Sequence, residues 1–159
     1  MADKATIVVF SGDLDKVLAA FIIATGAAAQ GMDVTMFFTF WGLNAIKKDK
    51  GPIKGAKNWM QKMMGMMNRG GASRLPLSKF NMGGMGKMMM KKIMKSQNVT
   101  TLPELMEAAI DLDVKLWPCK MSMDVMGVGK EDLIPETGNP VGVAAYTAEA
   151  AQSKLNLFI

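Results

Sequence analysis

Short apolar runs that alternate with helix-like segments constrain the fold of this chain more than any other feature. The run at residues 5–10 is rich in β-branched residues and ends in phenylalanine, which is typical of a strand buried on both faces. Runs at residues 33–39, 114–117 and 155–159 predict three more strands. Because helical patterns separate these runs, we expect a three-layer α/β fold, in which a parallel sheet with right-handed crossovers is flanked by helices.

The helices between the strands are predicted from their caps and their apolar spacing. Thr101 and Glu104 form a capping-box pattern, in which the threonine caps the helix and the glutamate reaches back. Asn139 followed by Pro140 is typical of a cap and a first helical residue. We therefore expect helices between Asp13 and Gly31, from Thr101 through Ile110, from Met121 to Gly127 and from Asn139 to about Ser153, with a short helix after Trp41. The side chain of Asp13 is expected to cap the first of these helices.

The length and composition indicate one folded domain, residues 1–159, because half of the 159 residues are hydrophobic. The sequence shows neither a secretory pattern nor an apolar run long enough to span a membrane, so we expect a cytoplasmic location. The chain has one cysteine and no histidine. An internal disulfide, histidine-based triads and the usual zinc sites are therefore excluded, and we expect no metal and no cofactor.

Residues 47–97 differ in composition from the rest of the chain and are interpreted as a basic, methionine-rich insertion. They hold thirteen of the 19 basic residues but only one of the 14 acidic residues. Eleven of the 18 methionines lie between Met60 and Met94. Such a segment is too long for an ordinary connection in a small α/β domain, so a functional role is expected.

Two interpretations of this insertion remain open. The methionine and lysine clusters at residues 87–95 predict a basic amphipathic helix, and residues 56–97 could then bind an anionic membrane or an acidic partner. Alternatively, the methionines pack over the sheet or at a subunit interface while the lysines are solvated. Specific nucleic-acid binding is not expected, because the insertion contains only Trp59 and Phe80 as aromatic residues and no recognised binding module.

Cys119 directly follows the third predicted strand and opens the next helix. The carboxyl ends of parallel strands are where ligands and reactive groups gather. The positive end of a helix dipole and the neighbouring Lys120 both favour a thiolate, so Cys119 is interpreted as a nucleophile. The alternative is that Cys119 is a small buried hydrophobic residue with no chemical role.

Loops after the first two strands are expected to lie at the same sheet edge and to form a pocket with Cys119. They would supply hydrogen-bond donors and an aromatic wall, while a lysine and a serine of the following helix would hold and solvate a sulfur anion. The predicted support residues are Ser11, Gly12, Asp13, Thr39, Trp41, Lys120 and Ser122.

Three stretches of the sequence carry a resemblance to a known family. They are VVFSGDLDK at residues 8–16, PCKMSMDVMG at residues 118–127 and LNLFI at residues 155–159. The chain resembles the DsrE/DsrF-like family over essentially its whole length, and most closely the larger DsrE-type subfamily with a methionine-rich insertion. The resemblance implies a flavodoxin- or Rossmann-like α/β fold in small cytoplasmic proteins that are commonly oligomeric. It also implies sulfane sulfur carried as a persulfide, here on Cys119.

A sulfur carrier or sulfurtransferase is therefore the leading hypothesis. The expected partners are sulfur donor and acceptor proteins or low-molecular-weight persulfides, and the chain is expected to form a homo-oligomer. Two other functions remain open. One is a non-catalytic docking protein that acts through the insertion, and the other is a thiol redox protein that depends on an external thiol, because the chain has no second cysteine.

Overall fold

The sheet of the computed structural model, which describes residues 2–49 and 54–159, contains four parallel strands in the order β3-β2-β1-β4. The strands are β1 Lys4–Val9, β2 Asp33–Phe38, β3 Lys115–Pro118 and β4 Leu155–Phe158. β1 pairs with β2 along its whole length, from Lys4 opposite Asp33 to Val9 opposite Phe38. On its other side β1 pairs with β4, and β2 pairs with β3. The predicted strands and their parallel direction are confirmed.

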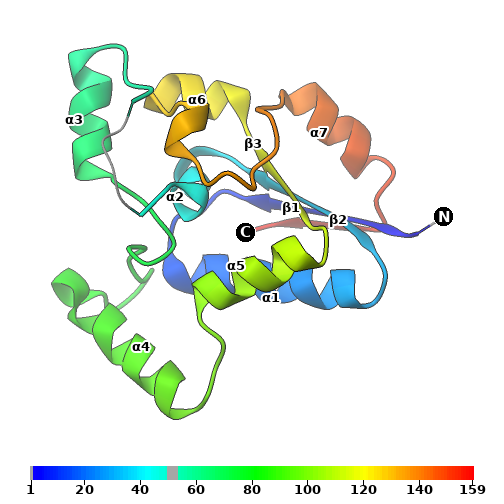
Figure 1. The fold of residues 1–159 in the computed structure, drawn as a ribbon, viewed down its shortest axis with the longest axis horizontal. Coiled ribbons are helices and arrows are strands. Elements are labelled where there is room, and N and C mark those ends of the chain that lie inside the picture. The colour runs from blue at the N-terminus through cyan, green and yellow to red at the C-terminus, as the bar shows by residue number, and fades with distance from the viewer. Residues whose placement is uncertain (1, 50–53) are drawn as a thin grey trace.

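Helices flank this sheet as the alternation of patterns predicts. They are α1 Leu14–Ala29, α2 Leu43–Ile46, α3 Trp59–Met67, α4 Met85–Ser96, α5 Leu102–Asp111, α6 Lys120–Met126 and α7 Val143–Ala150, with short 3-10 turns at Phe40–Gly42, Met82–Gly84 and Lys130–Asp132. α1 and α5 lie together on one face of the sheet, and α6 and α7 lie on the opposite side (Figure 1). The expected three-layer α/β fold is confirmed.

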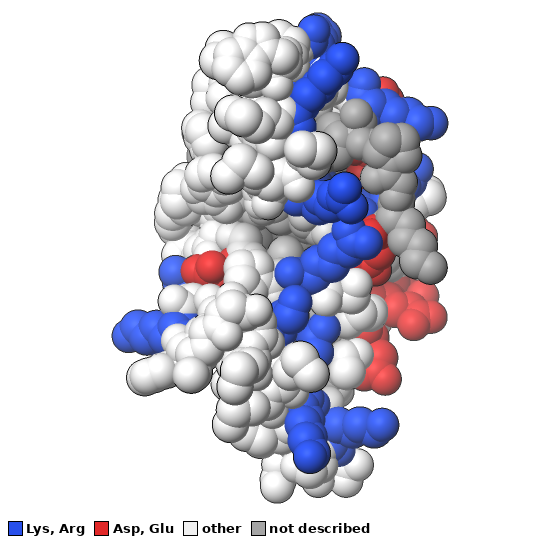
Figure 2. Space-filling model, turned by 90° about the vertical axis from the view of Figure 1, so that its left-hand side faces the viewer, with Lys and Arg blue, Asp and Glu red and all other residues white. Residues whose placement is uncertain are grey.

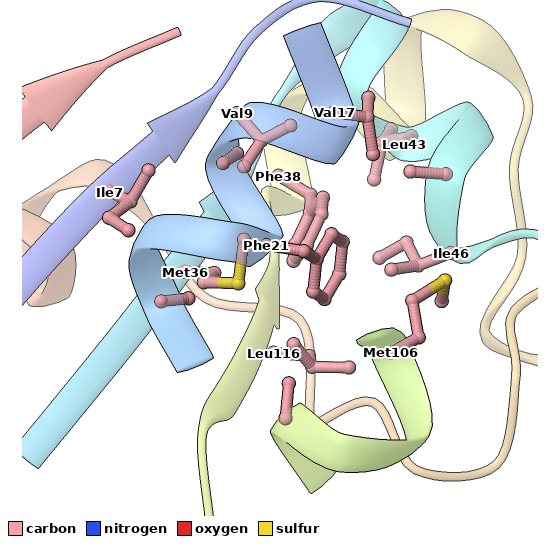
Figure 3. Close-up of a cluster of buried hydrophobic side chains, with 14 of the residues drawn as sticks. Ile7, Val9, Val17, Phe21, Met36, Phe38, Leu43, Ile46, Met106 and Leu116 are labelled. Carbon is pink, nitrogen blue, oxygen red and sulfur yellow. The ribbon is translucent and has the colours of Figure 1, made fainter. Parts of the chain in front are cut away.

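The main core lies between the sheet and the helices α1 and α5 (Figure 3). Phe21 of α1 and Phe38 of β2 are both fully buried, and their ring centroids are 6.1 Å apart. Because side chains alternate along a strand, Phe37 points to the other face. There it belongs to a smaller cluster with Val8 and Cys119, against which Trp117, Val141 and Tyr146 pack. The cysteine therefore lies on the α7 side of the sheet.

The capping predictions differ in outcome. The box at α5 is confirmed, because the backbone N–H and the hydroxyl of Thr101 both donate to Oε2 of Glu104, at 2.7 and 2.8 Å. Asp13 occupies the N-cap position of α1, but its side chain makes no capping hydrogen bond. It instead forms an ion pair with Lys16, at 3.1 Å. The capping role predicted for the Asp13 side chain is therefore wrong.

The helix predicted from Asn139 to about Ser153 is shorter, since α7 covers Val143–Ala150 with Gly142 as its N-cap. The backbone of Val141 explains the late start. Its N–H donates to the carbonyl of Pro118 and its carbonyl accepts from the N–H of Lys120, at 3.0 and 2.9 Å. These two bonds hold the backbone of Val141 parallel to the end of β3. If the helix began at Asn139, the carbonyl of Pro118 and the N–H of Lys120 would lose these partners.

The insertion contributes α3 and α4, whose side chains are largely exposed. Gly65 is the one buried residue of α3, and α4 has none. The predicted helix at residues 87–95 lies within α4, but the prediction that the methionines pack over the sheet of their own chain is wrong. Figure 2 shows this side of the molecule, where uncharged side chains form a broad patch bordered by a band of Lys and Arg. Among the described residues, no helix has the length and apolar character needed to cross a membrane.

Candidate functional site

The carboxyl ends of the four strands meet at one edge of the sheet because all four strands run in the same direction. Short backbone hydrogen bonds continue the pairing past the strand ends. The N–H of Cys119 donates to the carbonyl of Phe38 at 2.8 Å, and that of Thr39 donates to the carbonyl of Val9 at 3.1 Å. The N–H of Phe10 donates to the carbonyl of Ile159 at 2.7 Å. The loops expected at this edge are therefore brought there.

Cys119 occupies the N-cap position of α6, as the sequence predicts, but its side chain is buried. It is 4% exposed and packs with Val8 and Phe37. Tyr146 of α7 stacks on the ring of Phe37, with centroids 4.7 Å apart, and together with Val141 covers this cluster. The sulfur consequently does not lie in the open pocket that the sequence analysis expected.

The two support residues on α6 have other partners. The ammonium group of Lys120 forms an ion pair with Asp124 one turn along the helix, and both side chains are more than half exposed. Ser122 is fully buried, and its hydroxyl lies 2.7 Å from that of Thr39. This hydrogen bond joins α6 to the end of β2. Thr39 and Ser122 are thus brought together, and their hydrogen bond fixes the position of the helix that Cys119 opens.

The remaining predicted residues line a separate hollow. Ser11, Gly12, Asp13 and Trp41 surround a volume of about 300 Å³ after β1, and Cys119 is not among its lining residues. The hydroxyl of Ser11 accepts a hydrogen bond from the N–H of Asp13 at 3.1 Å, which shapes the loop. The structure therefore brings these four residues together, but it does not join them to the cysteine as the sequence analysis expected.

Three polar residues at or near this hollow were not predicted from the sequence. Asn44 and Asn68 line the hollow, and Lys47 contacts Asn68. Lys47 is 4% exposed, and its ammonium donates to the backbone carbonyl of Asn68 at 3.1 Å. Burial lowers the pKa of Lys47 from 10.5 to about 8, although the negative charge of Asp132 acts in the opposite direction. The one available sequence signal is that Lys47 directly follows the uncharged, largely apolar stretch at residues 43–46, which forms the buried helix α2.

The buried Lys47 makes a specific pH dependence of stability expected. Between pH 8 and 10.5 the unfolded chain keeps the proton that the folded chain has lost, so the free energy of unfolding should rise through this range. The full rise would be about 3 kcal/mol for this shift. Chemical denaturation should show this rise in wild type and not in Lys47→Met. The exposed neighbour provides a control, Lys48→Met, which should keep the wild-type slope. If the free energy of unfolding depends on pH in the same way in wild type and Lys47→Met, the lowered pKa of Lys47 is contradicted.

The chain matches a family model and two known proteins over almost its whole length. The model of the DsrE/DsrF/DrsH-like family matches residues 1–158. The chain is 48% identical to the uncharacterized protein YrkE of Bacillus subtilis (strain 168), over 98% of this chain and 96% of YrkE. It is 34% identical to the sulfur carrier protein DsrE2 of Allochromatium vinosum, over 98% of both chains. These matches confirm the resemblance inferred from the sequence.

Solved structures support the fold alone, because their sequence identities are low. The ychN protein from E. coli matches with a TM-score of 0.56 and 10% identity, over the whole of both chains. MTH1491 from Methanobacterium thermoautotrophicum, a protein of unknown function, matches with a TM-score of 0.55 and 9% identity, over 99% of both chains. Both similarities extend over the complete sheet and its helices.

Proposed function

Because the chain belongs to the DsrE/DsrF/DrsH-like family, we propose that it is a cytoplasmic sulfur carrier that holds sulfane sulfur as a persulfide on Cys119. Membership of this family and the 34% identity to a sulfur carrier protein support a role in sulfur relay. The observation that carries the assignment to Cys119 is its position. It is the one cysteine of the chain and lies at the carboxyl end of β3, at the N-cap of α6. Its partners would be sulfur donor and acceptor proteins or low-molecular-weight persulfides.

The chemistry requires one thiolate. The Cys119 thiolate attacks the outer sulfur of a donor persulfide, the donor S–S bond breaks, and its electron pair leaves on the donor thiolate. The Cys119 persulfide then passes its outer sulfur to an acceptor thiolate by the same exchange, and the electron pair returns to Cys119. Neither step changes the net oxidation state, so no metal, histidine or external oxidant is needed.

The burial of Cys119 adds a requirement to this proposal, since an attacking donor must reach the sulfur. The covering helix α7 has no fully buried residue, which is typical of a segment that opens at low free-energy cost. The preceding loop is held more firmly. The Lys130 ammonium donates to the carbonyl of Gly138 and the hydroxyl of Thr137, at 2.7 and 2.8 Å. We therefore place the opening at α7, with Lys130 fixing the loop before it.

Intact-mass spectrometry after incubation with polysulfide tests sulfur loading on Cys119. Wild type should gain one or more sulfur masses, and a low-molecular-weight thiol should remove them. Cys119→Ser should gain none, because a hydroxyl cannot carry sulfane sulfur. Val125→Ser serves as the matched control, since it introduces a serine at an exposed position of the same helix and leaves the thiol in place. A folded wild type without an adduct would contradict the proposal, as would Cys119→Ser that still gains sulfur.

A second candidate function is docking on an anionic membrane through residues 56–97, and the exposed face of α3 and α4 favours it. Ten of the thirteen exposed large apolar residues of this segment are methionines. Figure 2 shows that uncharged side chains on this side are bordered by Lys and Arg. Such a surface suits insertion of flexible apolar side chains between anionic headgroups. Its exposed apolar residues are Trp59, Met60, Met63, Met64, Met66, Met67, Phe80, Met82, Met85, Met88, Met89, Met90 and Ile93.

Vesicle sedimentation tests whether the chain docks on membranes or is a sulfur carrier without membrane binding. Wild type should sediment with phosphatidylglycerol vesicles and much less with phosphatidylcholine vesicles, and salt should weaken the binding. Replacing both Met88 and Met89 by serine should reduce the bound fraction several-fold. Ile22→Ser is the matched control, because Ile22 is an exposed apolar residue of α1 outside this face. Equal binding of the double variant and wild type would contradict membrane docking.

The edge of the sheet supports the expected homo-oligomer. β4 is an edge strand, and Phe158 on it is 70% exposed while its ring stacks on Phe10, with centroids 5.7 Å apart. An exposed aromatic pair beside an unpaired strand edge is the kind of surface that proteins cover by association. We therefore include self-association at this edge in the proposed function.

A further inference from the structure

Two hollows that share lining residues lie beside the carboxyl end of β1. The first, of about 300 Å³, is the one lined by Ser11, Asp13 and Trp41. The second, of about 370 Å³, lies under the loop that follows α3 and includes Arg69 and Arg74 in its lining. Asn44, Asn68 and Pro76 line both hollows.

The side chains of Asn44 and Asn68 form a pair with unused hydrogen-bonding capacity. Nδ2 of Asn44 donates to Oδ1 of Asn68 at 2.7 Å. Oδ1 of Asn44 and Nδ2 of Asn68 are buried and have no partner among the residues that the structure describes. Asn44 is 6% exposed, so this arrangement is costly for a native protein. If the O and N atoms of both amides are exchanged, the pair still forms one hydrogen bond and still leaves one acceptor and one donor free.

The surrounding backbone packs closely against this amide pair and holds it in place. The carbonyl of Asn44 accepts from the N–H of Gly71 at 2.7 Å, and that of Asn68 accepts from the ammonium of Lys47 at 3.1 Å. Gly70 has a positive φ of 66°, and a Cβ there would lie 3.0 Å from Oδ1 of Asn44. A side chain at position 70 would therefore crowd the free acceptor, so the glycine and these backbone contacts keep the amide pair preorganised.

The charges around the hollows favour an anion. Lys16 lines the first hollow, and Arg69 and Arg74 line the second. Asp13 is the one acidic residue in either lining, and its ion pair with Lys16 already compensates its charge. The two arginines have no acidic partner among the described residues and can bind a carboxylate in bidentate fashion.

An amide group matches the free atoms of the pair. Its N–H would donate to Oδ1 of Asn44, and its carbonyl would accept from Nδ2 of Asn68, so both unused positions would be satisfied. We propose that Asn44 and Asn68, with Arg69 and Arg74, form a binding site for a small carboxylate that carries an amide group. The site lies outside the cluster around Cys119, so its occupation does not depend on sulfur carriage.

NMR titration of the uniformly ¹⁵N-labelled chain with N-acetylglycine tests this site. The side-chain NH₂ signals of Asn44 and Asn68 should shift in a saturable manner, with a dissociation constant on the order of millimolar for so small a probe. Propionate, which has the carboxylate but no amide, should bind at least about five-fold more weakly, because it leaves the amide pair unsatisfied. Cys119→Ser should bind N-acetylglycine like wild type.

Variants decide which residues carry the binding. Asn68→Ala and the double variant Arg69→Gln, Arg74→Gln should each weaken it by about five-fold or more, and Lys92→Gln on the exposed side of α4 should not. The arginines are exposed, so their replacement keeps the test valid if Asn68→Ala does not fold. The absence of saturable shifts would overturn the proposal. Equal binding of propionate, or wild-type affinity in the folded variants, would also overturn it.

Discussion

The placement of β1 between β2 and β4 is the constraint on which the rest of this structure depends. Its residues from Ala5 to Val9 are almost completely buried, and its backbone pairs with a parallel strand on each side. Because all strands share its direction, their carboxyl ends meet at one edge and deliver Phe10, Thr39 and Cys119 to it. The cysteine, the polar hollows and the exposed aromatic pair are all consequences of this parallel pairing.

Local sequence patterns are sufficient for the strands and most helices, but not for α3 or for every boundary. The strands and the capping box at Thr101 depend on neighbouring residues, so their patterns predict them correctly. The order of the strands depends on packing between distant segments, which periodicity does not report. The predicted start of α7 at Asn139 is wrong for a similar reason. Asn139 and Pro140 favour a helix locally, but the backbone of Val141 is used to bridge the end of β3.

In the candidate sites too, contacts between distant segments could not be predicted from local sequence patterns. The position of Cys119 at a strand end followed from the sequence, whereas its burial under Tyr146 depends on a contact with α7 that no motif encodes. The pair of Asn44 and Asn68 joins residues 24 positions apart, one of them inside a segment whose composition emphasised methionine and lysine. Long-range polar contacts of this kind become visible only once the chain is folded.

In the proposed sulfur carrier, Cys119 becomes reactive when α7 opens. The rate of sulfur loading from polysulfide in wild type and in Tyr146→Ala, followed by mass spectrometry, tests this most directly. The Tyr146 ring stacks on Phe37 over the cysteine cluster, so its removal should raise the population of the open state and accelerate loading several-fold. An unchanged loading rate in a folded Tyr146→Ala variant would contradict the account.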